Sequence, residues 1–151
     1  MAYIDGFVLA VPTANKKKFI EHANKFDALW LEYGAIRVLE NWGDDVPTGK
    51  QTDFHRAVLA KDDETVVFSF VEWPDKATRD AGVEKLMKDP RMDPKANPMP
   101  FDGMRMIFGG FSPVVDIGSS TYLEDDLSGR LAASKVDKGK ERLGKDTSSR
   151  H

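Results

Sequence analysis

The chain of 151 residues contains no cysteine. It therefore cannot form a disulfide, a thiolate nucleophile or a zinc–thiolate site, which excludes three classes of chemistry together. Its longest apolar runs, 7–11 and 66–71, are at most about half the length that a bilayer-spanning helix needs. The N-terminus also lacks a basic region leading into an apolar stretch of the signal-peptide kind. These absences predict a cytoplasmic protein with no membrane partner.

Positive charge is in slight deficit, because 22 Lys and Arg stand against 25 Asp and Glu and give a formal net charge of -3. Nucleic-acid binding draws on basic residues placed along a phosphate track, and here they are interspersed with acidic ones. We therefore expect no nucleic-acid partner. Hydrophobic residues make up 40% of the chain, with nine Phe and three Trp, which suffices for the core of one domain.

The apolar periodicity and the turn residues predict four strands and two helices. Strands are expected at 3–11, 35–42, 65–73 and 105–115, and helices at 13–33 and 75–88. Thr13 is expected to cap the first helix, Asp75 the second, and Met87 to face the core with Ala77, Val83 and Leu86. Gly109 and Gly110 predict a bulge or a close backbone approach. The resulting order, β-α-β-β-α-β, predicts an α+β, ferredoxin-like sandwich with an antiparallel sheet.

The segment 44–57 contains more charged and turn-forming residues than a loop that only connects two strands needs. It is the first candidate functional loop. Thr52 or Asp53 is expected to cap a short helical turn there. A histidine beside carboxylates can act as a general base near neutral pH, so His55 and Asp53 are the candidate catalytic residues. The other interpretation is an exposed loop histidine. The histidines lack metal-ligand spacing, and we expect no metal site and no cofactor.

The proline-rich segment 90–103 is the second candidate loop, because it cannot form regular structure. Charged residues of the two loops could form a paired network that fixes the loops or a dimer contact, or that binds a substrate carboxylate through arginine. Phe101, with nearby methionines, could line a ligand cavity or belong to the core. The candidate ligand-binding residues are therefore Asp53, Arg56, Phe101, Asp102 and Arg105.

The segment 119–151 is poor in aromatics and rich in Lys, Asp, Gly and Ser. Thr121 and Glu124 match a capping box, and leucines recur every four residues, so a marginal helix is expected at 121–136. Disorder is expected after it. We therefore expect one ferredoxin-like domain at 1–118 and a polar tail at 119–151.

Several ordered stretches resemble YbaA-like proteins, the family designated domain of unknown function 1428. They are Tyr3–Phe7, Asp44–Lys50, Asp63–Ser69 and Met99–Ile107, with Gly109–Phe111. The resemblance runs through residues 1–117 and leaves the tail outside. It implies a dimeric α+β barrel, in which the sheets of two subunits face each other and the helices lie outside. That superfamily includes cofactor-free monooxygenases, isomerases and haem proteins, and fold analogy does not select among them.

Three functional hypotheses follow from these observations. The first is a homodimer that binds a small molecule in a cleft under the 44–57 loop, since an apolar open sheet face calls for a second sheet. The second is an enzyme resembling the cofactor-independent monooxygenases or isomerases, with His55 or Asp53 as its base. The third is an interaction module that acts through the charged C-terminal tail. Whether the protein is an enzyme is left open by the sequence.

Overall fold

The computed structural model describes residues 1–118. Residues Met1–Pro113 form one compact unit, and the chain from Val114 onward belongs to a second. The predicted 121–136 helix and the disorder after it lie outside the described residues, and the predicted domain boundary at Gly118 stays a prediction. No helix within residues 1–118 is long and apolar enough to cross a membrane.

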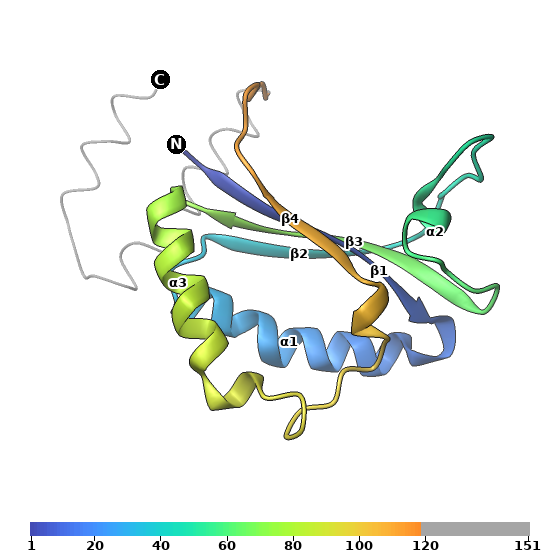
Figure 1. The fold of residues 1–151 in the computed structure, drawn as a ribbon, viewed down its shortest axis with the longest axis horizontal. Coiled ribbons are helices and arrows are strands. Elements are labelled where there is room, and N and C mark those ends of the chain that lie inside the picture. Colours follow the sequence, from blue (N-terminus) through green and yellow to red (C-terminus); the bar gives the residue numbers. More distant parts are fainter. Residues whose placement is uncertain (119–151) are drawn as a thin grey trace. The chain divides into compact units, whose positions relative to one another are not determined.

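Four antiparallel strands form one sheet in the order β2-β3-β1-β4 (Figure 1). Two main helices connect them, so the chain follows the order β-α-β-β-α-β that the sequence predicts. The predicted α+β, ferredoxin-like fold is therefore confirmed. The elements are β1 (Tyr3–Pro12), α1 (Lys16–Glu32), β2 (Arg37–Trp42), β3 (Glu64–Trp73), α3 (Lys76–Lys88) and β4 (Ile107–Phe111), with a short helix α2 (Phe54–Ala57) between β2 and β3.

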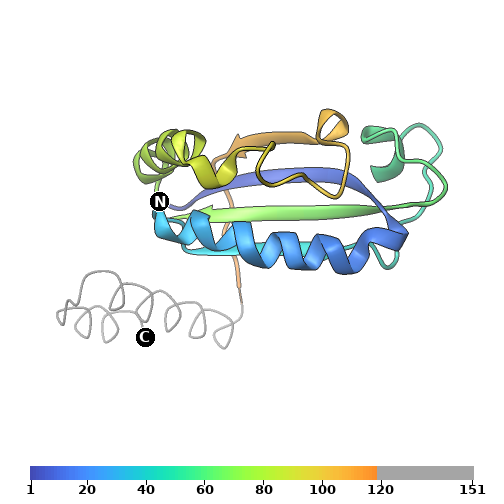
Figure 2. The same cartoon turned by 90° about the horizontal axis from the view of Figure 1, so that it is seen from below.

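Helices α1 and α3 both lie on one side of the sheet (Figures 1 and 2). The apolar stripe of α1 is buried there at Phe19, Ala23, Phe26 and Leu29. Helix α3 comes close to β3 at Gly82, where a Cβ atom would lie 2.8 Å from the Trp73 ring. The prediction that Met87 faces the core is wrong: its side chain is 65% exposed, because Gly82 and Leu86 form the buried face of α3.

Two local predictions also need correction. Thr13 does not cap α1, since a 3-10 turn at Thr13–Asn15 precedes the helix and the Thr13 hydroxyl hydrogen-bonds to that of Thr65 at 2.7 Å. Strand β4 ends at Phe111 and pairs with β1 without interruption through Gly109 and Gly110, so no bulge forms. The alternative, a close approach, is confirmed at Gly110, where a Cβ atom would lie 2.9 Å from the ring of Tyr3.

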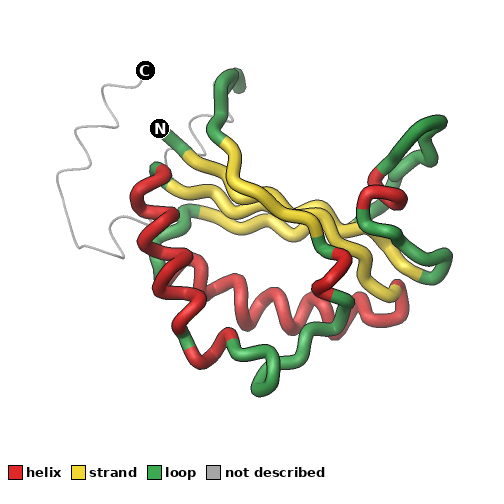
Figure 3. Tube along the Cα trace, in the orientation of Figure 1, coloured by secondary structure: helices red, strands yellow, loops and turns green. Residues whose placement is uncertain are grey.

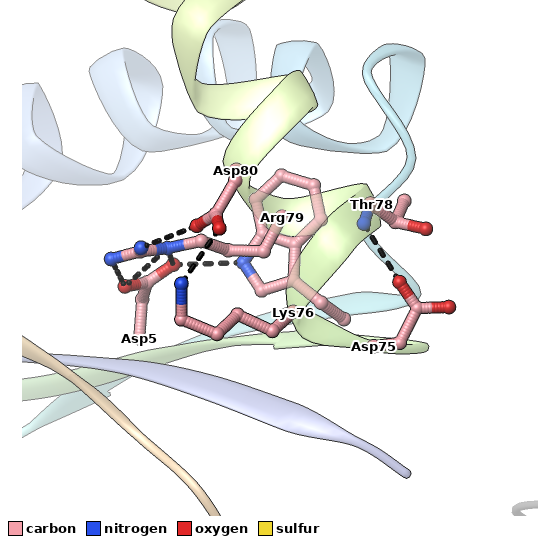
Figure 4. A network of polar contacts seen from close by, with 7 residues as sticks. Asp5, Asp75, Lys76, Thr78, Arg79 and Asp80 are labelled. Carbon is pink, nitrogen blue, oxygen red and sulfur yellow. Dashed lines mark hydrogen bonds and ion pairs between the residues drawn. The ribbon is translucent and has the colours of Figure 1, made fainter.

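A buried acid joins β1 to α3 (Figure 4). Asp5 is 5% exposed and accepts hydrogen bonds from Trp73 Nε1 at 2.8 Å and from Arg79 Nη2 at 2.7 Å. The start of α3 is fixed independently, because Asp75 accepts a hydrogen bond from the Thr78 backbone N–H at 2.7 Å, as the predicted cap requires. The sheet and helix α3 are therefore locked together by a charge-assisted contact inside the core.

Within the compact unit of residues 1–113, the other side of the sheet, which we call the open face, is covered at one end only. There Val58, which follows α2, is buried against Ala10 and Val66. The strand register places alternate residues of every strand on this face. Phe68 is 46% exposed and Phe111 is 61% exposed. Beyond the covered end, the apolar residues of the open face are Ile4, Val8, Leu39, Phe68, Phe70, Ile107 and Phe111.

Candidate functional site

The predicted candidates in the 44–57 loop hold the loop itself together. Asp53 caps α2, as expected, and accepts hydrogen bonds from the backbone N–H groups of Arg56 at 2.7 Å and Gly49 at 3.1 Å. These bonds hold the pKa of Asp53 below its usual value. Arg56 Nε lies 3.6 Å from the same carboxylate, and His55 is half-buried on α2. The hydrogen-bonding capacity of Asp53 is thus largely used within the loop.

The candidates near β4 form a second, separate contact. Arg105 donates to Asp102 at 3.0 Å and to the Leu59 carbonyl oxygen at 2.9 Å. Its main partner is Glu64, which it contacts through two hydrogen bonds of 2.6 and 2.7 Å. These bonds lower the pKa of Glu64 to about 2. Arg105 therefore ties the start of β4 to β3, and Glu64 is the partner that sequence reasoning missed.

Phe101 is the one predicted candidate that lines a cavity. Its ring lies 6.1 Å from the Phe19 ring, edge to face, at the core cluster formed by Leu9, Val11, Phe19 and Val67. Phe101 packs on the core, as one of the two interpretations predicts, and also faces a hollow beside it. A role in lining a ligand cavity stays a prediction.

This hollow, the inner cavity, has a volume of about 140 Å³ and lies between α1, the sheet and the loop that connects α3 to β4. That loop runs along α1 (Figure 3). It is held at one end by an Arg91–Glu32 ion pair of 2.7 Å and at the other by a hydrogen bond from Asn15 to the Pro100 carbonyl oxygen. The cavity is lined by Phe7, Leu9, Phe19, His22, Ala23, Phe26, Asp27, Trp30, Val38, Glu40, Ser69, Val71, Met92, Phe101 and Met106.

A second hollow, the outer cleft, lies along the exposed edge where α1 meets β2 and has a volume of about 510 Å³. It reaches the surface residues Lys16, Asn24 and Ala28. Five residues line both hollows and so lie between them, and we call this shared lining the neck. The neck consists of Phe19, Ala23, Asp27, Val38 and Glu40.

Two of the neck residues are carboxylic acids that face each other, Asp27 from α1 and Glu40 from β2. Burial and a hydrogen bond with Glu40 raise the pKa of Asp27 to about 9. Asp27 therefore holds a proton at neutral pH, and its carboxyl group hydrogen-bonds with that of Glu40. Two acids in one apolar site behave in this way because both cannot ionise without strong repulsion.

Two further polar side chains line the inner cavity. Ser69 lies directly opposite Glu40 in the pairing of β2 with β3 and is 3% exposed. Within residues 1–118, the Ser69 side chain forms no hydrogen bond, so its hydroxyl is available to a group in the cavity. The His22 ring lies 4.6 Å from the Phe26 ring, and burial lowers the pKa of His22, which favours the neutral imidazole.

The sequence contains a signal for the carboxyl pair. Glu40 stands between Val38 and Trp42 in the period-two pattern of β2 and therefore faces the helices with them. Asp27 follows Ala23 by four residues on α1, at the margin of the apolar stripe. Among the described side chains of residues 1–118, no three His, Asp or Glu residues gather in a way that could hold a metal ion.

The raised pKa of Asp27 predicts a pH-dependent stability. A carboxyl whose folded pKa exceeds its unfolded value stabilises the fold fully below about pH 4, and this contribution is lost as the pH rises through about 9. Urea unfolding of the wild type at pH 5, 7 and 9 should show the decline, by at most about 1.4 kcal/mol per pH unit. Asp27→Asn should flatten it.

Asp80→Asn is the matched control, because the ion pairs of this exposed acid lower its pKa. Its contribution is lost only at more acidic pH, so its curve should run parallel to that of the wild type between pH 5 and 9. A wild-type decline that Asp27→Asn leaves unchanged would exclude Asp27 as its source.

Comparison with known proteins places these residues in a family. The family described as "Protein of unknown function (DUF1428)" matches residues 2–103, which include the whole neck, His22 and Ser69. The "Uncharacterized protein YbaA" of Escherichia coli (strain K12) is 52% identical over 116 residues, which cover 77% of this chain and 99% of that protein. The protein of the same name in Shigella flexneri matches equally.

One solved structure, a dimeric ferredoxin-like protein from an uncultured marine organism, is also similar. It has 14% sequence identity and a TM-score of 0.49, over 78% of this chain and 98% of that chain.

Proposed function

The chain belongs to the DUF1428 family of proteins of unknown function, and from its geometry we propose that it binds a small organic molecule between α1 and the sheet. The ligand would occupy the inner cavity and reach the outer cleft through the neck. One observation carries this proposal: a hydrogen-bonded carboxyl pair lies at the mouth of an otherwise largely apolar cavity.

The size and the lining of the inner cavity support this proposal. Its volume of about 140 Å³ is close to that of an engineered apolar cavity of roughly 150 Å³ that binds benzene. Ligand sites are typically apolar hollows with a few convergent polar groups, and strongly shifted pKa values concentrate at such sites. The outer cleft supplies an approach from solvent.

This proposal moves the ligand away from the cleft first expected under the 44–57 loop. Asp53 and Arg56 are engaged in closing that loop, and Asp102 and Arg105 in tying β4 to β3. Of the five ligand-binding candidates from the sequence, we retain Phe101, because it lines the inner cavity.

A cofactor-independent enzyme, resembling an isomerase or a monooxygenase, is the second candidate. It is favoured by the raised pKa of Asp27, since a carboxyl that keeps its proton at neutral pH can act as a general acid. We assign this role to Asp27 in preference to His55 or Asp53, because the neck opens on both hollows. The test is whether the protein converts a compound that it binds. If Asp27→Asn abolishes this conversion but leaves the affinity for the compound unchanged, an enzyme is favoured over a plain binding protein.

We further infer that two copies associate through the open face. Large exposed apolar patches mark interaction surfaces, and the uncovered part of this face carries seven apolar side chains. The paired glycines Gly6 and Gly109 sit side by side on it, and the ring of Phe111 lies over them. A second sheet of the same kind would cover these residues, and the homodimer expected from the family resemblance has this arrangement.

A fragment screen by ligand-observed NMR tests the binding proposal. Ala23→Leu should fill the neck and weaken the binding of wild-type hits at least roughly tenfold, because Ala23 is buried and lines both hollows. Ala28→Leu is the matched control on the same helix, where the side chain is exposed and lines only the outer cleft. Hits that both variants bind as well as the wild type would contradict the proposal. Circular dichroism establishes that each variant is folded, and Val38→Phe replaces Ala23→Leu if the latter is not.

A further inference from the structure

We propose that the inner cavity and its neck take a compact organic cation, with an apolar body of about the size of benzene and a guanidinium or ammonium head at the carboxyl pair. This inference rests on the proposed function and specifies the chemistry of the ligand. It is carried by the arrangement of acceptors around the cavity, the charge of the neck and the aromatic walls.

The polar groups that line the inner cavity are mainly hydrogen-bond acceptors. Asp27 and Glu40 contribute carboxyl oxygens, and Ser69 contributes a hydroxyl that has no partner within residues 1–118. A neutral His22 adds one acceptor nitrogen. No Lys or Arg is among the residues that line this cavity. A ligand head with several N–H donors, such as a guanidinium or an ammonium, can satisfy the carboxyl oxygens of this set, while the Ser69 hydroxyl accepts one further N–H.

The charge of the neck favours a cation over an anion. The carboxyl pair of Asp27 and Glu40 lies in a partly buried site, where a charge interacts more strongly than in water. The basic residue of the outer cleft, Lys16, holds its ammonium 5.4 Å from the centre of the Trp42 ring. An anionic head would meet the carboxyl pair directly and be repelled.

The walls of the cavity suit the body of such a ligand. The rings of Phe19, Phe26, Trp30 and Phe101 line it together with aliphatic side chains. Aromatic faces also attract a cation that comes within about 6 Å of a ring centre. A flat hydrocarbon body would therefore enter the inner cavity, while its charged head stays in the neck.

Three probes of one shape separate charge from fit, and we would titrate each into the full-length protein by calorimetry. Benzylguanidinium carries the positive charge, benzylurea is its neutral counterpart, and phenylacetate is an anion. We expect benzylguanidinium to bind at least about tenfold more tightly than benzylurea, and phenylacetate to bind most weakly. We also expect proton release when benzylguanidinium binds at pH 7, because the head replaces the proton of Asp27. Proton release makes the measured binding enthalpy depend on the buffer, so we would repeat the titration in buffers with different enthalpies of ionisation.

Glu40→Gln and Glu21→Gln form the matched pair of variants, since both remove one acid and Glu21 is exposed on α1 outside both hollows. Glu40→Gln should weaken benzylguanidinium about tenfold or more and leave benzylurea nearly unchanged, whereas Glu21→Gln should change neither. Ser69→Ala should weaken benzylguanidinium by a smaller factor. If circular dichroism shows that Glu40→Gln does not fold, the ratio of the benzylguanidinium and benzylurea affinities of the wild type tests the cation preference instead.

The outcomes distinguish this inference from the proposed function. If benzylurea binds the wild type as tightly as benzylguanidinium and Ala23→Leu weakens both, the cavity binds ligands but the cation preference is overturned. If phenylacetate binds most tightly, the cation preference is likewise overturned. If none of the three probes binds and the fragment screen gives no hit sensitive to Ala23→Leu, both proposals fail.

Discussion

Replacing Asp5 with asparagine will lower the free energy of unfolding by about 3 kcal/mol, at the lower end of the cost of breaking a buried ion pair. The carboxylate of Asp5 accepts hydrogen bonds from both Arg79 and Trp73 in the core. An amide at this position removes the charge that compensates Arg79, whose side chain is only 24% exposed. Thermal unfolding should shift downward by roughly 10 °C. Urea unfolding at one fixed protein concentration gives the free energy itself.

Asp80→Asn is the control for this prediction. Asp80 also pairs with Arg79, at 3.0 Å, but its side chain is 47% exposed. An exposed ion pair contributes at most about 1 kcal/mol, so this variant should remain close to the wild type. Equal losses for the two variants would show that the burial of Asp5 does not govern the stability of the β1–α3 contact.

Replacing Phe68 with lysine will dissociate the proposed homodimer, with an expected loss of about 2–4 kcal/mol, or 30- to 1,000-fold, in association. Phe68 lies on the open face of β3, next to Val8 of β1 and Asn41 of β2. In an interface between two open faces it would be buried, and a lysine there would bring an uncompensated charge between the sheets. Sedimentation velocity over a dilution series gives the dissociation constants of the wild type and the variant.

Met87→Lys is the matched control, because Met87 is more exposed than Phe68 but belongs to α3 on the helix side of the sheet. Its sedimentation should equal that of the wild type. A wild-type protein that sediments as a monomer at micromolar concentration, or a Phe68→Lys variant that still dimerises fully, would contradict association through the open face.

The sequence predicted the fold because the signals that define its elements are local. Runs of β-branched and aromatic residues define β1 and β3. The aspartates that cap α2 and α3 accept hydrogen bonds from N–H groups only three residues further along the chain. Errors arose where a distant partner decides the local structure. Thr13, for example, bonds to Thr65, 52 residues away, and a 3-10 turn takes the place of the expected cap.

The candidate site was harder to predict for the same reason. The sequence drew attention to charged loops, yet the ion pairs of Asp53 and Asp102 lie within three residues of each acid and close the loops locally. The carboxyl pair instead joins α1 to β2, and its effect depends on the apolar walls that the sheet and the loop 89–102 build around it. Phe101 was found because an aromatic residue among methionines is a recognisable apolar cluster.

The protonation of Asp27 tests the central claim of this account most directly. Carbon-detected NMR of the side-chain carboxyls, followed from pH 3 to pH 11, gives the pKa of each aspartate. We predict that Asp27 titrates at about 9 in the wild type and at a lower pH in Glu40→Gln. An Asp27 carboxyl that titrates near 4 in the wild type, as an exposed aspartate does, would contradict the protonated Asp27 and the site built on it.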